Sequence, residues 1–250
     1  AMCSEAHSAA ARKIAGEGIV LLRNANHTLP IELNVTERPT ILVVGENAIK
    51  MMTVGGGSSS LKAKYEISPL QGIQERAGNM AKVQYVRGYV GDVGGEYNGV
   101  TTGQSLQDDR TPEQLTAEAV EAAKKADYVI FVGGMNKAHN QDCEDGDRLH
   151  YELPYAQDQL ITALAAVNDH VIFVSISGNA HGMPWCNDVE AILQAWYSGS
   201  ETGHAVADVI FGDVNPSGKL PYTIQPSLAD YPAHQYGEIA YPGVDKQVHY

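Results

Sequence analysis

Continuous apolar runs that alternate with helical segments constrain the fold of this chain most strongly. Residues 128–132 (YVIFV) and 170–176 (HVIFVSI) are rich in Val, Ile and Phe and show no polar alternation. Such runs are typical of parallel strands that are buried on both faces beneath crossover helices. The sequence therefore predicts an α/β protein with a single, mostly parallel six-stranded sheet between two layers of helices, a flavodoxin-like α/β sandwich.

The predicted sandwich domain occupies residues 31–225. A helix and a short strand at residues 19–22 precede it within residues 1–30, and residues 226–250 form a C-terminal extension. The strands are expected at residues 40–44, 83–86, 128–132, 170–176, 189–196 and 220–224. The helices are expected from Ser4, Ser68, Thr111, Leu153-Pro154 and Glu201. Right-handed crossovers then place the loops that follow the strands at one edge of the sheet, where open α/β sheets bind ligands.

The charge and the cysteines exclude several functional classes. The formal net charge is −13, which argues against nucleic acid or an anionic membrane surface as a partner because both require clustered Lys and Arg. A neutral substrate such as a sugar is compatible with this charge. Cys3, Cys143 and Cys186 are too few and too scattered for a disulfide framework or a zinc site. We expect no metal or other cofactor and no membrane partner.

An acidic loop follows the strand at residues 128–132. It holds Asp142, Glu144, Asp145, Asp147 and Arg148 within seven positions. Carboxylates beside an Arg at a ligand-binding edge suit proton transfer or polyol binding. The alternative is a solvated run of charges. The spacing does not fit a calcium loop, because the glycine that such a loop requires is absent.

Two further loops are candidates for ligand contacts. Gly55–Ser60 matches neither the phosphate loop nor the dinucleotide fingerprint, and it remains either a donor-rich loop near a ligand or a plain linker. Trp185 follows Met183-Pro184 in a loop and is either a platform for a sugar or a core residue.

Four stretches together resemble one known family. They are residues 7–24 (HSAAARKIAGEGIVLLRN), the acidic loop up to Leu153-Pro154, residues 177–185 (SGNAHGMPW), and the late motif from Gly199 to Pro221. In order and spacing they resemble the C-terminal α/β domain of glycoside hydrolase family 3, especially the bacterial β-glucosidases. The resemblance covers nearly the whole chain. It implies that residues 1–30 lead in from a barrel domain, and that the chain ends before the family's last segment.

The resemblance implies a retaining exo-acting mechanism that uses a nucleophile and a general acid/base. The nucleophile of the family is an Asp on a preceding (β/α)8 barrel, usually followed by Trp, and no Asp-Trp pair occurs here. The isolated chain is therefore expected to be inactive, with the barrel as its partner. The expected substrate is a β-linked oligosaccharide or aryl glycoside, and the family suggests a periplasmic or secreted location.

Each expected site residue has a role in this scheme. Glu144, four residues before Arg148, matches the general acid/base, with Asp142 as the runner-up. We expect neighbouring carboxylates to raise the pKa of Glu144, and Arg148 to fix the loop by pairing with Asp147. The expected sugar contacts are Ser58, Ser59, Asn179 and Trp185. The alternative function is a stand-alone carbohydrate-binding or structural domain without chemistry.

Overall fold

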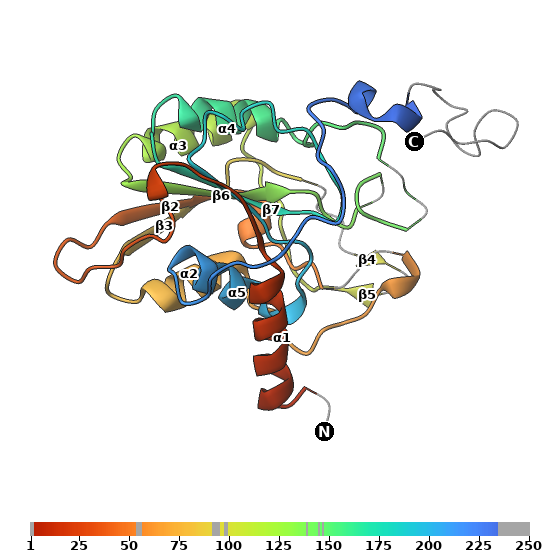
Figure 1. The fold of residues 1–250 in the computed structure, drawn as a ribbon, viewed down its shortest axis with the longest axis horizontal. Helices are drawn as coiled ribbons and strands as arrows, with labels where there is room; N and C mark the ends of the chain where they lie inside the picture. Colours follow the sequence, from red (N-terminus) through yellow and green to blue (C-terminus); the bar gives the residue numbers. More distant parts are fainter. Residues whose placement is uncertain are drawn as a thin grey trace, which may run out of the picture.

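The computed structural model describes residues 3–53, 57–91, 96–97, 100–138, 140–144, 146 and 148–234. Its centre is a six-stranded sheet with the order β1-β8-β7-β6-β2-β3, in which every neighbouring pair is parallel except β1 and β8. Helices α3 and α4 cover one face, and α2 and α5 cover the other (Figure 1). The predicted three-layer α/β sandwich is therefore confirmed.

The strands of the sheet are β1 (Val20–Asn24), β2 (Thr40–Val44), β3 (Lys82–Val86), β6 (Tyr128–Gly134), β7 (Val171–Ile176) and β8 (Ala191–Gln194). A separate two-stranded ribbon consists of β4 (Glu96–Tyr97) and β5 (Val100–Thr101). The helices are α1 (Glu5–Gly18), α2 (Pro69–Ala77), α3 (Pro112–Ala123), α4 (Gln157–Ala165) and α5 (Thr202–Ile210). The short 3-10 turns are η1 (Ala25–His27), η2 (Glu46–Ala48), η3 (Gly57–Ser59), η4 (Gly199–Glu201) and η5 (Leu228–Asp230).

The number of strands was predicted correctly, but one strand was assigned to the wrong segment. Residues 220–224 form no strand. Pro221 has no backbone N–H to offer a sheet, and Gly218 N instead donates to Ile19 O over 3.0 Å. The sixth strand is β1, which pairs antiparallel with β8. The strand that we expected to lie in a lead-in segment before residue 31 is therefore part of the sandwich.

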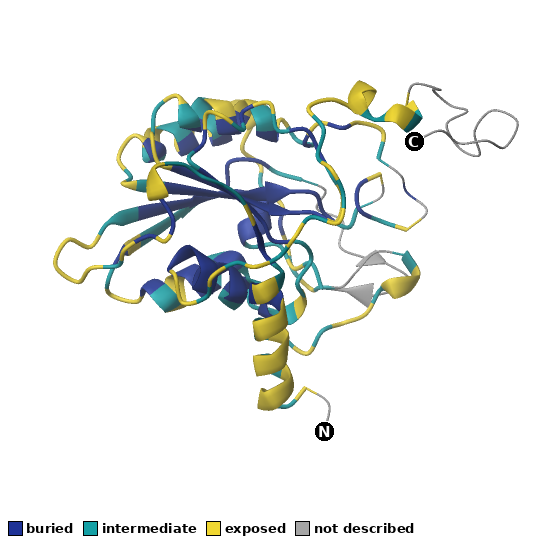
Figure 2. Cartoon of the chain, in the orientation of Figure 1, coloured by how far each residue is buried: buried dark blue, intermediate teal, exposed yellow. Residues whose placement is uncertain are grey.

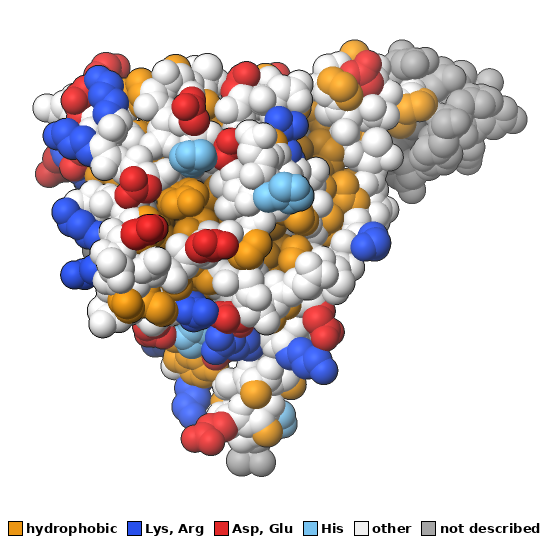
Figure 3. Space-filling model, turned by 60° about the vertical axis from the view of Figure 1, so that its left-hand side comes forward, with side chains coloured by type: hydrophobic (Ala, Val, Ile, Leu, Met, Phe, Trp, Pro, Cys, Tyr) orange, Lys and Arg blue, Asp and Glu red, His pale blue; other side chains and the backbone are white. Residues whose placement is uncertain are grey.

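The core lies on both faces of the sheet because successive strand residues point in opposite directions. Ile41 and Val43 of β2 face the layer of α2 and α5, whereas Leu42 and Val44 face α3 and α4. All four side chains are fully buried. Figure 2 shows that the strands of the sheet are buried, whereas α1 is largely exposed. On the face shown in Figure 3, acidic and basic side chains are interspersed.

The start of α4 differs from the prediction. The helix begins at Gln157 rather than at Leu153-Pro154, because Tyr155 and Ala156 have left-handed backbone conformations with φ of 61° and 56°. The side chain of Gln157 fixes this start. Its Oε1 accepts from Gly134 N over 2.9 Å, and its Nε2 donates to Gly134 O over 2.8 Å. The end of β6 is thereby joined to the beginning of α4.

Candidate active site

The loops that follow β2, β6, β7 and β8 meet at the carboxyl edge of the sheet, as the parallel topology predicts. Ser58 from the first loop touches Glu144 from the second. Asn179 from the third and Tyr197 from the fourth both reach Asp142. Three of the predicted contact residues, Ser58, Glu144 and Asn179, are therefore brought to one edge.

Asp142 fastens the acidic loop to its neighbours. Its Oδ2 accepts from Gly178 N over 2.7 Å and from the hydroxyl of Tyr197 over 2.9 Å, and its Oδ1 accepts from Asn179 Nδ2 over 3.0 Å. The residue is only 9% exposed. A buried carboxylate requires such donors, because desolvation of an unpaired charge is costly. Asp142 is thus held as a structural anchor between three loops.

Glu144 has a different environment two residues along the chain. Its side chain is exposed. Its Oε2 accepts from Ser58 N over 2.5 Å, and the turn approaches so closely that a Cβ added to Gly57 would lie 2.4 Å from Glu144 Cβ. Hydrogen bonds from the Ser58 side chain and backbone lower the pKa of Glu144. The expected raised pKa is therefore wrong for this arrangement, because donors rather than neighbouring carboxylates dominate.

Arg148 holds the far end of the acidic loop. Its Nη2 donates to Ala180 O over 2.5 Å, so the guanidinium connects this loop to the loop after β7. The expected partner Asp147 lies outside the described residues. Arg148 and Asp142 therefore attach the acidic loop to the same neighbouring segment at two points.

The prediction that Trp185 is a sugar platform is wrong. The side chain is 1% exposed and packs edge-on against Phe173 with ring centroids 4.6 Å apart. Its indole Nε1 donates to Asp158 Oδ1 over 2.7 Å. The ring is buried in the core and its N–H is paired with Asp158, so neither face of the indole ring is available to a ligand. The core alternative for Trp185 is the one that the structure shows.

A cavity of about 440 Å³ lies beside Asp142. Its lining includes Lys137, Arg148, His150, Asn179 and His234. Neither Lys137 nor Tyr197 was a candidate from the sequence, yet Lys137 Nζ lies 3.7 Å from the centroid of the Tyr197 ring. Burial lowers the pKa of Lys137, and burial together with Asp142 raises the pKa of Tyr197. Only their position after β6 and β8 could have indicated these residues.

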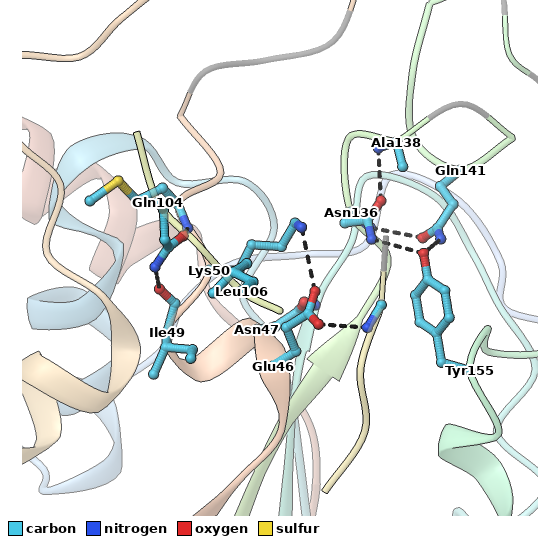
Figure 4. A network of polar contacts seen from close by, with 12 residues as sticks. Glu46, Asn47, Ile49, Lys50, Gln104, Leu106, Asn136, Ala138, Gln141 and Tyr155 are labelled. Carbon is cyan, nitrogen blue, oxygen red and sulfur yellow. Dashed lines mark hydrogen bonds and ion pairs between the residues drawn. The ribbon is translucent and has the colours of Figure 1, made fainter. Parts of the chain in front are cut away.

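A buried polar network supports the ends of β2 and β6 (Figure 4). Glu46 is fully buried and accepts from Arg87 Nη2 over 2.9 Å and from Gly91 N over 2.5 Å, while Lys50 Nζ lies 3.4 Å from its Oε1. Asn136 Nδ2 donates to the hydroxyl of Tyr155 over 3.1 Å. Paired in this way, the buried charges stiffen the base from which the loops project.

Neither a metal site nor a membrane-spanning helix occurs in the described part of the chain. Among those residues, no group of three or more His, Cys, Asp or Glu side chains is placed to hold a metal ion. None of the helices described there combines the length and the apolar character needed to cross a bilayer.

The fold and the edge define an α/β domain that presents an exposed carboxylate on a loop attached to the segment after β7. Residues 19–250 match the family described as the glycosyl hydrolase family 3 C-terminal domain. The chain belongs to this family.

Its relatives are β-glucosidases from several organisms. A β-glucosidase of Bacteroides ovatus is 46% identical over 97% of this chain and 32% of its own length. A periplasmic β-glucosidase of Salmonella typhimurium is 36% identical over 92% of this chain and 30% of its own length. The crystal structure of a family 3 β-glucosidase of Bifidobacterium adolescentis has a TM-score of 0.76 at 32% identity, covering 96% of this chain and 31% of that one. The chain thus spans about a third of these relatives.

Proposed function

We propose that this chain is the second domain of a retaining, exo-acting β-glycosidase of the β-glucosidase type, with Glu144 as general acid/base. The observation that carries the proposal is the position of Glu144. It is an exposed carboxylate on the carboxyl edge, on a loop that Asp142 and Arg148 attach to the segment after β7. An acid/base must be fixed in position and yet open to the substrate, and Glu144 meets both conditions.

The nucleophile would come from another part of the enzyme. The β-glucosidase relatives are about three times as long as this chain, which leaves room for a barrel domain that carries an Asp. In retaining glycosidases the two carboxyl groups stand about 5 Å apart on either side of the scissile bond. The carboxyl edge would therefore face the barrel. The substrate class is a β-linked oligosaccharide or an aryl β-glycoside.

The protonation of Glu144 depends on this assembly. The Ser58 hydrogen bonds favour the charged carboxylate, whereas a general acid must carry a proton near neutral pH. Packing of a barrel against this edge would exclude water from Glu144 and raise its pKa. Exchange of the Ser58 contact for the leaving oxygen of the substrate would act in the same direction.

The test is the substitution Glu144→Ala in the full-length enzyme. Aryl glucosides with poor leaving groups should lose about 10²–10⁴-fold in rate, because they require the proton. Activated aryl glucosides should still form the glycosyl-enzyme, and azide should accelerate its breakdown by replacing the base-activated water. Steady-state rates over a series of leaving groups, with and without azide, measure both effects.

Glu152→Gln is the matched control, because Glu152 is an exposed acid near the end of the same loop. It should leave the rates unchanged. If Glu144→Ala behaves like this control, Glu144 is not the acid/base. If Asp142→Ala also keeps the original rates, the role of the domain is carbohydrate binding or structural support.

A further inference from the structure

The order of the strands predicts a crevice at the carboxyl edge between β2 and β6. β2 lies between β3 and β6. The chain passes from β2 to β3 through α2 on one face and returns from β3 to β6 through α3 on the other (Figure 1). The loops after β2 and β6 therefore turn away from each other. In open α/β sheets such a reversal leaves a crevice in which ligands bind.

A half-open pocket of about 260 Å³ lies at this place. Asn47 and Lys50 reach it from the loop after β2, Lys137 from the loop after β6, and Tyr197 from the loop after β8. It is separate from the cavity beside Asp142, with which it shares Lys137 among the residues that line both. Its size suits one small molecule.

The walls of the pocket are amphipathic. Ile67, Pro69 and Ile176 provide an apolar surface, and Lys50, Lys137 and Glu66 contribute polar groups, as do Thr53, Ser59, Ser198 and Thr202. A pyranose ring has the complementary character, with C–H groups on its faces and hydroxyls around its rim. Each hydroxyl can both donate and accept, so it can use an ammonium and a carboxylate in the same pocket.

The charges around the pocket are balanced. Lys50 Nζ lies 3.4 Å from the buried Glu46. The carboxylate of Glu66 accepts from Met52 N over 2.5 Å and from Thr53 N over 3.2 Å. Lys137 rests on the Tyr197 ring and lies in the field of Asp142. Each of the two lysines at the pocket therefore has a carboxylate in its surroundings, which favours a neutral ligand over an anion.

We propose that this pocket binds a single neutral sugar unit, at a position distinct from the bond on which Glu144 would act. Ser59 lines the pocket, and its neighbour Ser58 contacts Glu144, so the two positions adjoin. Because all the groups that line the pocket belong to this chain, binding depends neither on the proposed acid/base role nor on a barrel domain.

The experiment is a titration of the 250-residue chain with D-glucose, followed by ¹H–¹⁵N correlation spectra. The backbone amides of Lys50, Ile67 and Thr202 should shift with a Kd of about 1–10 mM, as expected for one small ligand with few contacts. The amides of Tyr151 and Asn179, which line the neighbouring cavity, should remain in place.

Two variants and a second ligand complete the test. Lys137→Met should weaken binding about tenfold, because a charged hydrogen bond is lost while the stem is retained. Lys125→Met, an exposed residue just beyond α3, should bind like the original chain. Absence of shifts with glucose would overturn the proposal, as would shifts confined to Tyr151 and Asn179. Tighter binding of D-gluconate than of D-glucose would show an anion site instead of a sugar site.

Discussion

Asp142 and Glu144 lie in the same loop but differ in burial and in the number of hydrogen bonds that they accept. Asp142 is nearly buried and accepts from three donors, whereas Glu144 is exposed and accepts from one turn. Three of the roughly four acceptor positions of the Asp142 carboxylate are thus occupied within the protein. The structure therefore distinguishes Asp142, which holds the loop in place, from Glu144, the candidate acid/base. Their spacing in the sequence could not make this distinction.

In the full-length enzyme, Asp142→Ala should reduce kcat by about tenfold or more, since it removes charged hydrogen bonds that hold the loop. The loss should be equal for good and poor leaving groups, and azide should not restore activity. Tyr197→Phe removes one donor of the same cluster and should show a smaller loss of the same kind. Rescue of Asp142→Ala by azide would instead identify Asp142 as the acid/base.

His181 contributes a pH-dependent part of the stability. It is 2% exposed, its Nδ1 donates to Gly182 O over 2.9 Å, and its Nε2 accepts from Ser175 Oγ over 2.9 Å. Burial lowers the pKa of His181 to about 4. The folded state therefore favours the neutral ring, and this contribution is complete above the unfolded pKa near 6.5 and is lost as the pH falls toward 4.

From this we expect the free energy of unfolding to fall by about 2–3 kcal/mol between pH 7 and pH 4 through His181. Urea denaturation of the chain at a series of pH values measures it. His181→Gln should be less stable at pH 7 but should have the flatter pH profile. His7→Gln, on the exposed surface of α1, is the control and should keep the original profile. Equal slopes for all three proteins would contradict the assignment.

At the scale of elements, α2 and α5 cross at a pair of glycines. A Cβ added to Gly72 would lie 2.0 Å from Gly203 O, and one added to Gly203 would lie 2.1 Å from Ser68 O. Both neighbours are backbone atoms, which cannot rotate away. The two helices can therefore approach this closely only while both positions lack a side chain.

Gly72→Ala should lower the free energy of unfolding by about 1–3 kcal/mol through overpacking, although alanine favours the helix by about 1 kcal/mol. Gly18→Ala is the matched control, because a Cβ there meets nothing within 4 Å. Its stability should be unchanged or slightly higher. Thermal or urea denaturation of the two variants gives the comparison, and an equal effect would show that the crossing can relax.

The elements that the sequence predicted best are those whose evidence is local. The Val and Ile runs of β2, β6 and β7 specify buried parallel strands by themselves. Residues 220–224 also have the local pattern of a strand, but they do not form one. Pro221 lacks a backbone N–H, and Gly218 contacts the end of α1 instead. β1 belongs to the sheet only through its distant partner β8. Patterns within a segment could not reveal that pairing.

In the candidate site, too, residues with a local sequence pattern could be predicted, whereas residues that depend on distant contacts could not. Glu144 and Asn179 could be found because each occurs in a recognisable loop at a predicted strand end. Lys137 and Tyr197 could not, because their interaction is a ring contact between two loops that are distant in the sequence. Trp185 was ambiguous for a related reason, since a tryptophan in a loop can turn either outward or inward. Here Asp158 and Phe173 hold it inside.

At the scale of the whole molecule, the proposed function requires two carboxyl groups, of which this chain would supply one. The isolated chain should therefore not hydrolyse aryl β-glucosides. A single general acid contributes about 10²–10⁴-fold, far below the acceleration that glycosidases achieve. Release of a chromogenic aglycone from the purified chain is the measurement. A rate typical of a complete β-glucosidase would show that the nucleophile lies within these 250 residues.

The antiparallel pair at the edge of the sheet has a consequence for the order of events during synthesis. Residues 20–24 are translated well before the strand at residues 191–194 with which they pair. Until then the early strand has no neighbour with which to exchange hydrogen bonds, and closing so long a loop is slow. The parallel strands can pair with one another as they are translated, while the strand at residues 20–24 remains unpaired. This border of the sheet can therefore be completed only after residues 191–194 have been translated.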